Sequence, residues 1–219
     1  MRRYIYFVFL LCCAVNLLLT SCVRQKYVVM DMVHHNPGEA MTESKFLDPS
    51  FLKKNEYGAK VFFLFEAAQF GIDWKSFDPS LFPATTEAGR WVAEKAEIIH
   101  KKYDAAKKED LQVYCMLDML VLPSLLVEKH RTELTNEQGK LDISKPYTQL
   151  CIRELMKEMF ETFPQLDGLV IRTGETYLHD APYYVGNHPV QNGMYDHITL
   201  INLLREEVCE RRNKKWFYR

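Results

Sequence analysis

One stretch of this sequence concentrates side chains that could do chemistry. The apolar run 169–171, entered through Asp167-Gly168, is typical of a strand buried on both faces of a parallel sheet. A group of charged and titratable side chains follows it directly: Arg172, Glu175, Tyr177, His179 and Asp180. Such groups just past the carboxyl end of a parallel strand lie where α/β folds place their active sites. The alternative is a polar loop with an Arg172–Glu175 ion pair.

Polar side chains recur at the ends of the other expected strands. Asp31 and His34 accompany the first strand, Glu66 ends the second, and Asp118 ends the third. Parallel strands bring their carboxyl ends to one edge of the sheet, so these side chains are candidates for a shared site. Asp31 lies inside its strand, which favours a buried structural carboxylate there.

The elements that would position these groups alternate along the chain. Strands are expected at 26–33, 59–66, 111–122 and 169–171, with a fifth opening at 214–219. Helices are expected at 51–56, 86–107 and 197–212, with another from a Ser144 N-cap to 163. The loop at 69–83 is rich in aromatic residues and, at this length, is expected to be functional.

This alternation predicts an α/β fold with a parallel sheet of right-handed βαβ units. Two architectures fit: a partial (β/α)8 barrel of about four and a half units, or a five-stranded doubly wound sheet. Polar residues after every strand favour the barrel, because a doubly wound sheet concentrates its site at one switch point.

Composition and the first residues bound the class of protein. The chain has 219 residues, is 47% hydrophobic and carries a formal charge of -1, so we expect one globular domain and no nucleic-acid partner. Residues 1–22 have the basic start, apolar run and small-residue end of an export signal. Leu19-Thr20-Ser21-Cys22 resembles the bacterial lipobox, which implies lipidation of Cys22 and a membrane-anchored lipoprotein, periplasmic or on the outer membrane. An ordinary signal peptide or anchor helix is the alternative.

No cofactor or metal is expected. The histidines lack the spacing of a zinc pair on one helix, and no phosphate-binding glycine motif is present. Cys115, Cys151 and Cys209 lie among apolar residues and are interpreted as buried small hydrophobes, with one disulfide as the alternative.

Three segments, 30–39, 167–177 and 215–219, resemble the catalytic (β/α)8 domain of secreted bacterial glycoside hydrolases, most closely α-glucuronidase-like and related barrels. The resemblance implies that residues 23–219 form one barrel-like domain and that Glu175, after strand four, is the acid/base carboxylate. The partner carboxylate of such barrels comes from a later strand. This implies a C-terminally truncated barrel, and we expect no activity if the protein ends at Arg219.

Glycoside hydrolysis uses two carboxyl groups that flank the scissile bond. Glu175 is the candidate general acid, and Arg172 could bind a sugar carboxylate through two hydrogen bonds. The remaining candidates would bind substrate hydroxyls or stack on sugar rings: Asp31, His34, Glu66, Asp118, Tyr177 and His179. Trp74, Tyr183 and Tyr184 are further candidates for stacking or for the core.

Three functional hypotheses follow from these residues. The first is a glycoside hydrolase-like lipoprotein, or the N-terminal part of one, that acts on polysaccharide-derived sugars. The second is a non-catalytic carbohydrate-binding surface lipoprotein. The third is a complete five-stranded α/β lipoprotein with an unrelated activity. Exposed barrel edges would also permit self-association.

Overall fold

The structure is a computed structural model that describes residues 30–31, 45–63, 66–174, 176–178 and 180–218. The leader at 1–22 and four of the predicted site residues lie outside this part of the chain: Cys22, His34, Glu175 and His179. The first expected strand is described only at Met30–Asp31.

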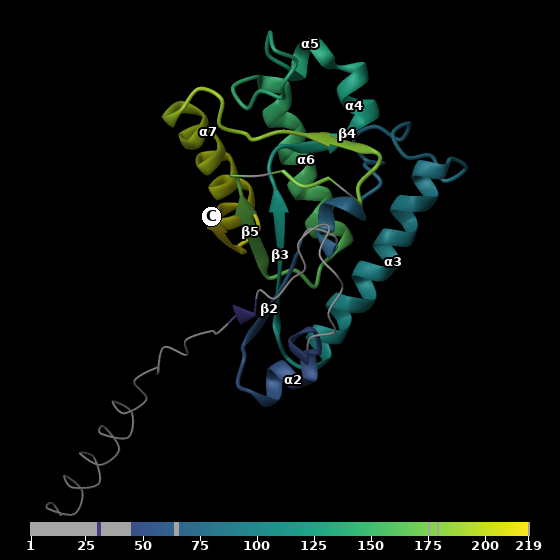
Figure 1. Cartoon of the computed structure of the whole chain (residues 1–219), viewed down its shortest axis with the longest axis vertical. Helices are drawn as coiled ribbons and strands as arrows, with labels where there is room; N and C mark the ends of the chain where they lie inside the picture. The colour runs from purple at the N-terminus through teal and green to yellow at the C-terminus, as the bar shows by residue number, and fades with distance from the viewer. Residues whose placement is uncertain (1–29, 32–44, 64–65, 175, 179, 219) are drawn as a thin grey trace, which may run out of the picture.

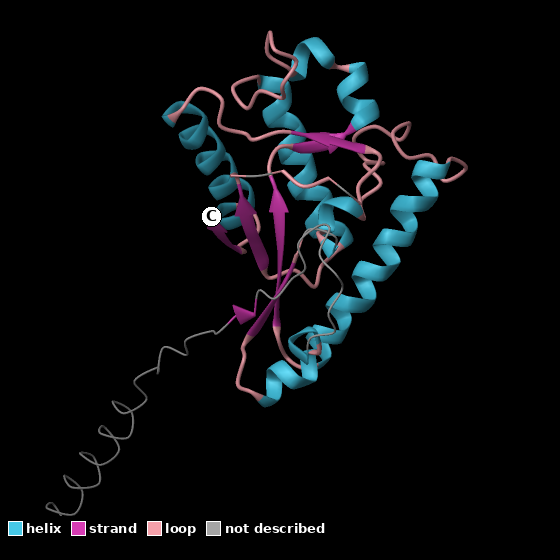
Figure 2. Cartoon of the chain, viewed as in Figure 1, coloured by secondary structure: helices cyan, strands magenta, loops and turns pink. Residues whose placement is uncertain are grey.

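A parallel sheet forms the centre of the molecule (Figures 1 and 2). Its strands are β1 (Met30–Asp31), β2 (Ala59–Phe62), β3 (Gln112–Asp118), β5 (Gly168–Arg172) and β7 (Lys215–Tyr218). They lie in the order β1-β2-β3-β5-β7, and every neighbouring pair is parallel. Each strand therefore pairs with the next parallel strand along the chain, as in a (β/α) barrel, whereas a doubly wound sheet reverses its order at a switch point. The fold is a partial α/β barrel, and the doubly wound alternative is wrong.

Helices connect these strands and cover one face of the sheet. They are α2 (Pro49–Lys54), α3 (Glu87–Lys108), α6 (Pro146–Thr162) and α7 (Met194–Leu204). Thr86 caps α3 by accepting a hydrogen bond from the Gly89 amide. The predicted Ser144 cap is wrong, because Lys145 occupies the N-cap of α6 while Ser144 donates to Asp142.

The two faces of the sheet bury different side chains. On the helix side, Cys115, Leu117 and Ile171 join the large core with α3 and α6. On the opposite face, a smaller cluster contains Val61, Phe63, Tyr114, Met116 and Val170. The alternation follows from the period of two along a strand. It places Asp118 and Arg172, each two residues beyond a member of the second cluster, on the face away from the helices.

A small antiparallel sheet lies across the carboxyl end of β3 (Figure 2). It pairs β4 (Val121–Pro123) with β6 (Tyr184–Gly186), and α4 (Ser124–Lys129) and α5 (Arg131–Leu134) follow β4. The single expected strand at 111–122 is therefore divided into β3 and β4. The side chain of Asn187 ties this layer together by bonding both the amide and the carbonyl of Leu141.

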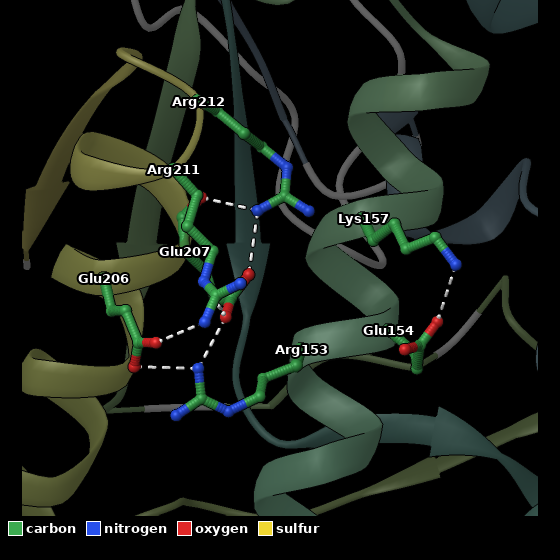
Figure 3. Close-up of polar contacts among 7 residues, drawn as sticks. All are labelled: Arg153, Glu154, Lys157, Glu206, Glu207, Arg211 and Arg212. Carbon is green, nitrogen blue, oxygen red and sulfur yellow. Dashed lines mark hydrogen bonds and ion pairs between the residues drawn. The ribbon is translucent and has the colours of Figure 1, made fainter.

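The last expected helix, 197–212, is also divided. It begins earlier as α7 and continues as the π-helix η4 (Arg205–Glu210). Glu207 of η4, only 4% exposed, accepts from Arg153 of α6, from Arg211 and from Arg212 (Figure 3). Arg153 also pairs with Glu206 at 2.8 Å. The ion pairs join two neighbouring helices of the outer layer.

Cys115 and Cys151 are buried, as predicted, whereas Cys209 is only half-buried. Cys115, Cys151 and Cys209 are free thiols, and burial raises the pKa of Cys115 and of Cys151 to about 12. At such pKa values almost no reactive thiolate forms at neutral pH. Within the described residues, no helix is both long and apolar enough to span a membrane.

Candidate functional site

A buried ion pair joins the carboxyl ends of two central strands. Asp118 ends β3 and Arg172 ends β5, and the two residues are partners in the register of the sheet. The Arg172 Nε donates to Asp118 Oδ1 at 2.6 Å, and Nη2 donates to Oδ2 at 2.8 Å. Asp118 is 1% exposed and the Arg172 side chain 10%. The bidentate geometry fixes the plane of the guanidinium.

Tyr177 completes this cluster from the loop after β5. Its backbone amide donates to Asp118 Oδ2 at 2.8 Å, so the carboxylate anchors the loop as well as the arginine. The Arg172 guanidinium lies 4.5 Å from the centroid of the Tyr177 ring. The same guanidinium lies 5.4 Å from the Phe63 ring, just after β2. The ends of three neighbouring strands thus contribute to one cluster. Both ring centroids lie within the distance of about 6 Å at which a guanidinium makes a cation–π contact.

The sequence prediction included three of these residues and missed the fourth. Asp118, Arg172 and Tyr177 were predicted individually, and the structure brings them into contact. Phe63 was assigned only to the apolar interior of a strand. Its position two residues after Val61 is the signal that could have identified it, since alternation places both on the face that carries Asp118 and Arg172.

Glu66 does not join this cluster. Its carboxylate pairs with Lys102 on α3, and its carbonyl accepts a hydrogen bond from the Tyr103 hydroxyl at 2.8 Å. Both contacts lie on the helix side of the sheet. The backbone of Asp31 pairs in register with Lys60 on the neighbouring strand β2.

The aromatic candidates separate into core and surface. Trp74 is fully buried and Tyr184 is 5% exposed, so neither offers a free face for a sugar ring. In the loop at 69–83, the side chains of Phe70, Trp74 and Phe82 are buried and pack in the core. Tyr177 and Tyr183 are half-buried.

The chemistry that this arrangement supports is recognition by charge and stacking. Asp118 accepts from the guanidinium twice and from one amide, so its oxygens are committed to structure. The hydroxyl oxygen of Thr176, next to Tyr177, is buried without a hydrogen bond to any described group. Among the described residues, no group of three or more His, Cys, Asp or Glu side chains has the arrangement of a metal site.

Comparison with known proteins gives distant structural neighbours only. No family model and no curated protein matches the chain. A GH138 enzyme that targets the pectin rhamnogalacturonan II matches with a TM-score of 0.38 and 16% identity, over 60% of this chain and 14% of its own. A noncanonic maltogenic α-amylase from Thermotoga neapolitana matches with a TM-score of 0.46 and 13% identity, over 83% of this chain and 42% of its own. Both neighbours are glycoside hydrolases, and the chain spans less than half the length of each. The assignment of the fold rests on the order of the strands in the sheet.

Proposed function

We propose that this chain is a glycoside hydrolase-like protein that binds polysaccharide-derived sugars at the carboxyl ends of β2, β3 and β5. The observation that carries the proposal is the Asp118–Arg172–Tyr177 cluster at that end of a partial barrel. Active sites of (β/α) barrels are built at this end. An arginine held rigidly beside an aromatic ring suits a sugar, whose apolar ring face stacks while its hydroxyl or carboxylate oxygens accept hydrogen bonds.

Catalysis in this proposal rests on Glu175, the predicted general acid, which lies outside the described residues. It would donate a proton to the leaving-group oxygen, while Arg172 and Tyr177 bind and orient the sugar. The second carboxyl group would come from a later strand of the complete barrel, by analogy with glycosidases of this fold.

A non-catalytic carbohydrate-binding role is the second candidate, and one observation favours it. Asp118 is committed to Arg172 and to the Tyr177 amide, and Glu66 is paired with Lys102. A carboxylate whose oxygens are held by structural partners is poorly placed to reach a substrate. Among the described strand ends, both of these carboxylates therefore serve structure.

A binding and hydrolysis experiment on three variants tests the proposal. Wild type, Tyr177→Ala and Glu175→Gln are titrated with neutral and uronate-containing oligosaccharides, and the products are separated by chromatography. We expect Tyr177→Ala to weaken binding about tenfold or more, because it removes the aromatic face against which the apolar face of the sugar packs, and a loss of about 1.4 kcal/mol is tenfold in affinity. Tyr195→Ala, at a tyrosine that is 81% exposed on α7, is the matched control.

The response of Glu175→Gln separates the two roles. Binding that survives while hydrolysis is lost supports the general acid. Binding by a wild-type protein that hydrolyses none of the bound sugars supports the non-catalytic role. If Tyr177→Ala binds every sugar as tightly as wild type does, the cluster is not the sugar site.

We also propose that the chain is an exported lipoprotein anchored through Cys22. The support is the sequence of residues 1–22, with its basic start and the Leu19-Thr20-Ser21-Cys22 end. Labelling of expressing bacteria with a palmitate analogue should mark the wild type and leave Cys22→Ala unmarked. Equal labelling of both would contradict lipidation at this cysteine.

A further inference from the structure

A pocket that contains no residue of the Asp118–Arg172–Tyr177 cluster lies between α4, the start of α3 and the loop before β6. Its volume is about 320 Å³, and its wall is mainly apolar, with a few polar groups. The apolar part comes from Leu81, Phe82, Pro83, Leu125, Pro182 and Tyr183. Small-molecule sites combine an apolar wall with a small number of placed polar groups, and this volume is at the lower end of their range.

Two polar side chains of the wall have no other described partner. Ser124 and Glu128 lie four residues apart on α4 and therefore share one face of that helix. Neither the Ser124 hydroxyl nor the Glu128 carboxylate forms a hydrogen bond or ion pair within the described part of the chain. By contrast, the Thr86 hydroxyl donates to the Pro83 carbonyl and accepts from the Gly89 amide, and the Ser80 hydroxyl donates to the Asp78 carboxylate. The pocket thus offers one hydroxyl and one carboxylate to a ligand.

The walls of the pocket are tied to one another. The Ser124 amide donates to the Tyr183 carbonyl at 2.9 Å, which joins α4 to the loop before β6. Lys129 of α4 pairs with Asp78 at 2.8 Å, which joins the same helix to the loop after β2. The Tyr183 ring is held edge-on against Trp91, with centroids 5.7 Å apart. A pocket whose walls are fixed before binding loses little entropy when it is filled.

We infer that this pocket binds one neutral sugar ring of a glycan, as a second subsite outside the barrel mouth. The inference rests on the proposed carbohydrate-binding function. The apolar wall suits the C–H face of a pyranose, while Ser124 and Glu128 suit its hydroxyls. Glu128 is the one charged side chain in the wall, so the pocket disfavours a uronate. The Arg172 cluster has the opposite preference.

The test isolates the pocket by using the Tyr177→Ala variant as the parent. In this variant, sugar binding at the Asp118–Arg172–Tyr177 cluster, called the mouth site below, is weakened. The probes are maltotriose, cellotriose and xylotriose, with trigalacturonic acid as the charged comparison, and binding is measured by isothermal titration and saturation-transfer NMR. Glu128→Gln and Leu125→Arg alter the pocket at solvent-accessible positions, so a folding failure of one leaves the other. Glu94→Gln, at an exposed position on α3, is the control.

We expect a neutral trisaccharide to bind in this background in the millimolar range and to bind about tenfold more weakly after either pocket substitution. Glu94→Gln should bind like its parent. If the neutral sugars bind wild type but lose affinity only through Tyr177→Ala, the pocket inference fails and the mouth site stands. If only trigalacturonic acid binds, and only at the mouth, the pocket inference again fails alone. Failure of every probe to bind wild type overturns both proposals.

Discussion

At the scale of single residues, the cluster at the strand ends depends on the buried positive charge of Arg172. Asp118 compensates the buried guanidinium of Arg172 with two hydrogen bonds and holds the Tyr177 amide with a third contact. Burial of an ion pair costs desolvation free energy, and loss of one partner leaves the other charge uncompensated. The same three contacts that stabilise the strand ends therefore also place the Tyr177 ring against the guanidinium.

The substitution Asp118→Asn should lower the free energy of unfolding by about 3–5 kcal/mol, because Arg172 stays buried without its carboxylate. Urea unfolding followed by circular dichroism measures the change. Glu97→Gln, which removes an exposed pair with Lys101, should lower the free energy of unfolding far less, because water screens an exposed ion pair. The double substitution Asp118→Asn/Arg172→Met should cost less than Asp118→Asn alone. Equal losses from the buried and the exposed pair would contradict this view.

Asp78 links stability to pH. The hydrogen bond from Lys129, then that from Ser80, lower its pKa from 3.8 to about 2. A carboxylate with a lowered folded-state pKa contributes stability above its unfolded pKa and loses it as pH falls through the folded value. The stability difference between wild type and Asp78→Asn should therefore be constant above pH 3.8 and shrink toward pH 2. Urea midpoints across this range test it, and a difference that does not change with pH would count against the Lys129–Asp78 tie.

Sequence reasoning reached these residues only in part. Side chains at the ends of strands are visible as polar residues after apolar runs, which identified Asp118 and Arg172 separately. The pairing of the two depends on the register of β3 against β5, which a single sequence does not contain. Likewise, Glu66 follows an apolar run as Asp118 and Arg172 do. It pairs with α3 because Lys102 lies within reach on that helix, and the sequence alone does not show this position.

At the scale of elements, close approach of backbones limits what the sequence can tolerate. A Cβ added at Gly168 would lie 2.0 Å from the Lys215 carbonyl oxygen, on the neighbouring strand β7. At Gly174, after the same strand, no atom of the described residues lies within 4 Å of an added Cβ. The β5–β7 pairing therefore requires the first glycine, whereas no described neighbour requires the second.

Gly168→Ala should accordingly destabilise the protein by at least about 1–3 kcal/mol, the usual cost of overpacking a filled site. Thermal unfolding gives the comparison with Gly174→Ala, which we expect to unfold close to the wild-type temperature. A wild-type unfolding temperature for Gly168→Ala would mean that β7 does not pair with β5 as closely as described.

The α6–η4 ion network should act on one helix pair rather than on the whole sheet. Arg153 contacts Glu206 and Glu207, and Arg211 and then Arg153 lower the pKa of Glu206 through their hydrogen bonds. Arg153→Met should cost about 1–3 kcal/mol, since it removes hydrogen bonds between charged groups. Arg205→Met, which removes the exposed pair with Glu210, should cost less. Hydrogen exchange should quicken in η4 after Arg153→Met, and unchanged protection there would contradict a clamp between the helices.

Long periodic elements were predictable and short ones were not. The helices α3 and α6 lie within a few residues of their predicted bounds, because apolar spacing and a cap or proline mark them. β4 and β6 are short, and their pairing joins residues far apart in the sequence. The spacing of apolar residues does not change where α7 continues as a π-helix at Arg205. The sequence therefore predicted one continuous helix.

At the scale of the whole molecule, the order of the strands determines what the chain can do. Alternation of strands and helices predicts a parallel sheet but leaves its order open, which is why two architectures fitted the sequence. The order β1-β2-β3-β5-β7 brings the ends of β2, β3 and β5 side by side. Only this order allows Phe63, Asp118 and Arg172 to form one cluster, and the sugar-binding proposal depends on it.

The most direct test of that proposal is a crystal structure of residues 23–219 soaked with the oligosaccharide that binds most tightly. Our account predicts a sugar ring at the carboxyl ends of β3 and β5, stacked on Tyr177 and hydrogen-bonded by the Arg172 side chain, with the Asp118–Arg172 pair unbroken. Sugar density elsewhere on the molecule, with the Tyr177 ring uncovered, would contradict the central claim.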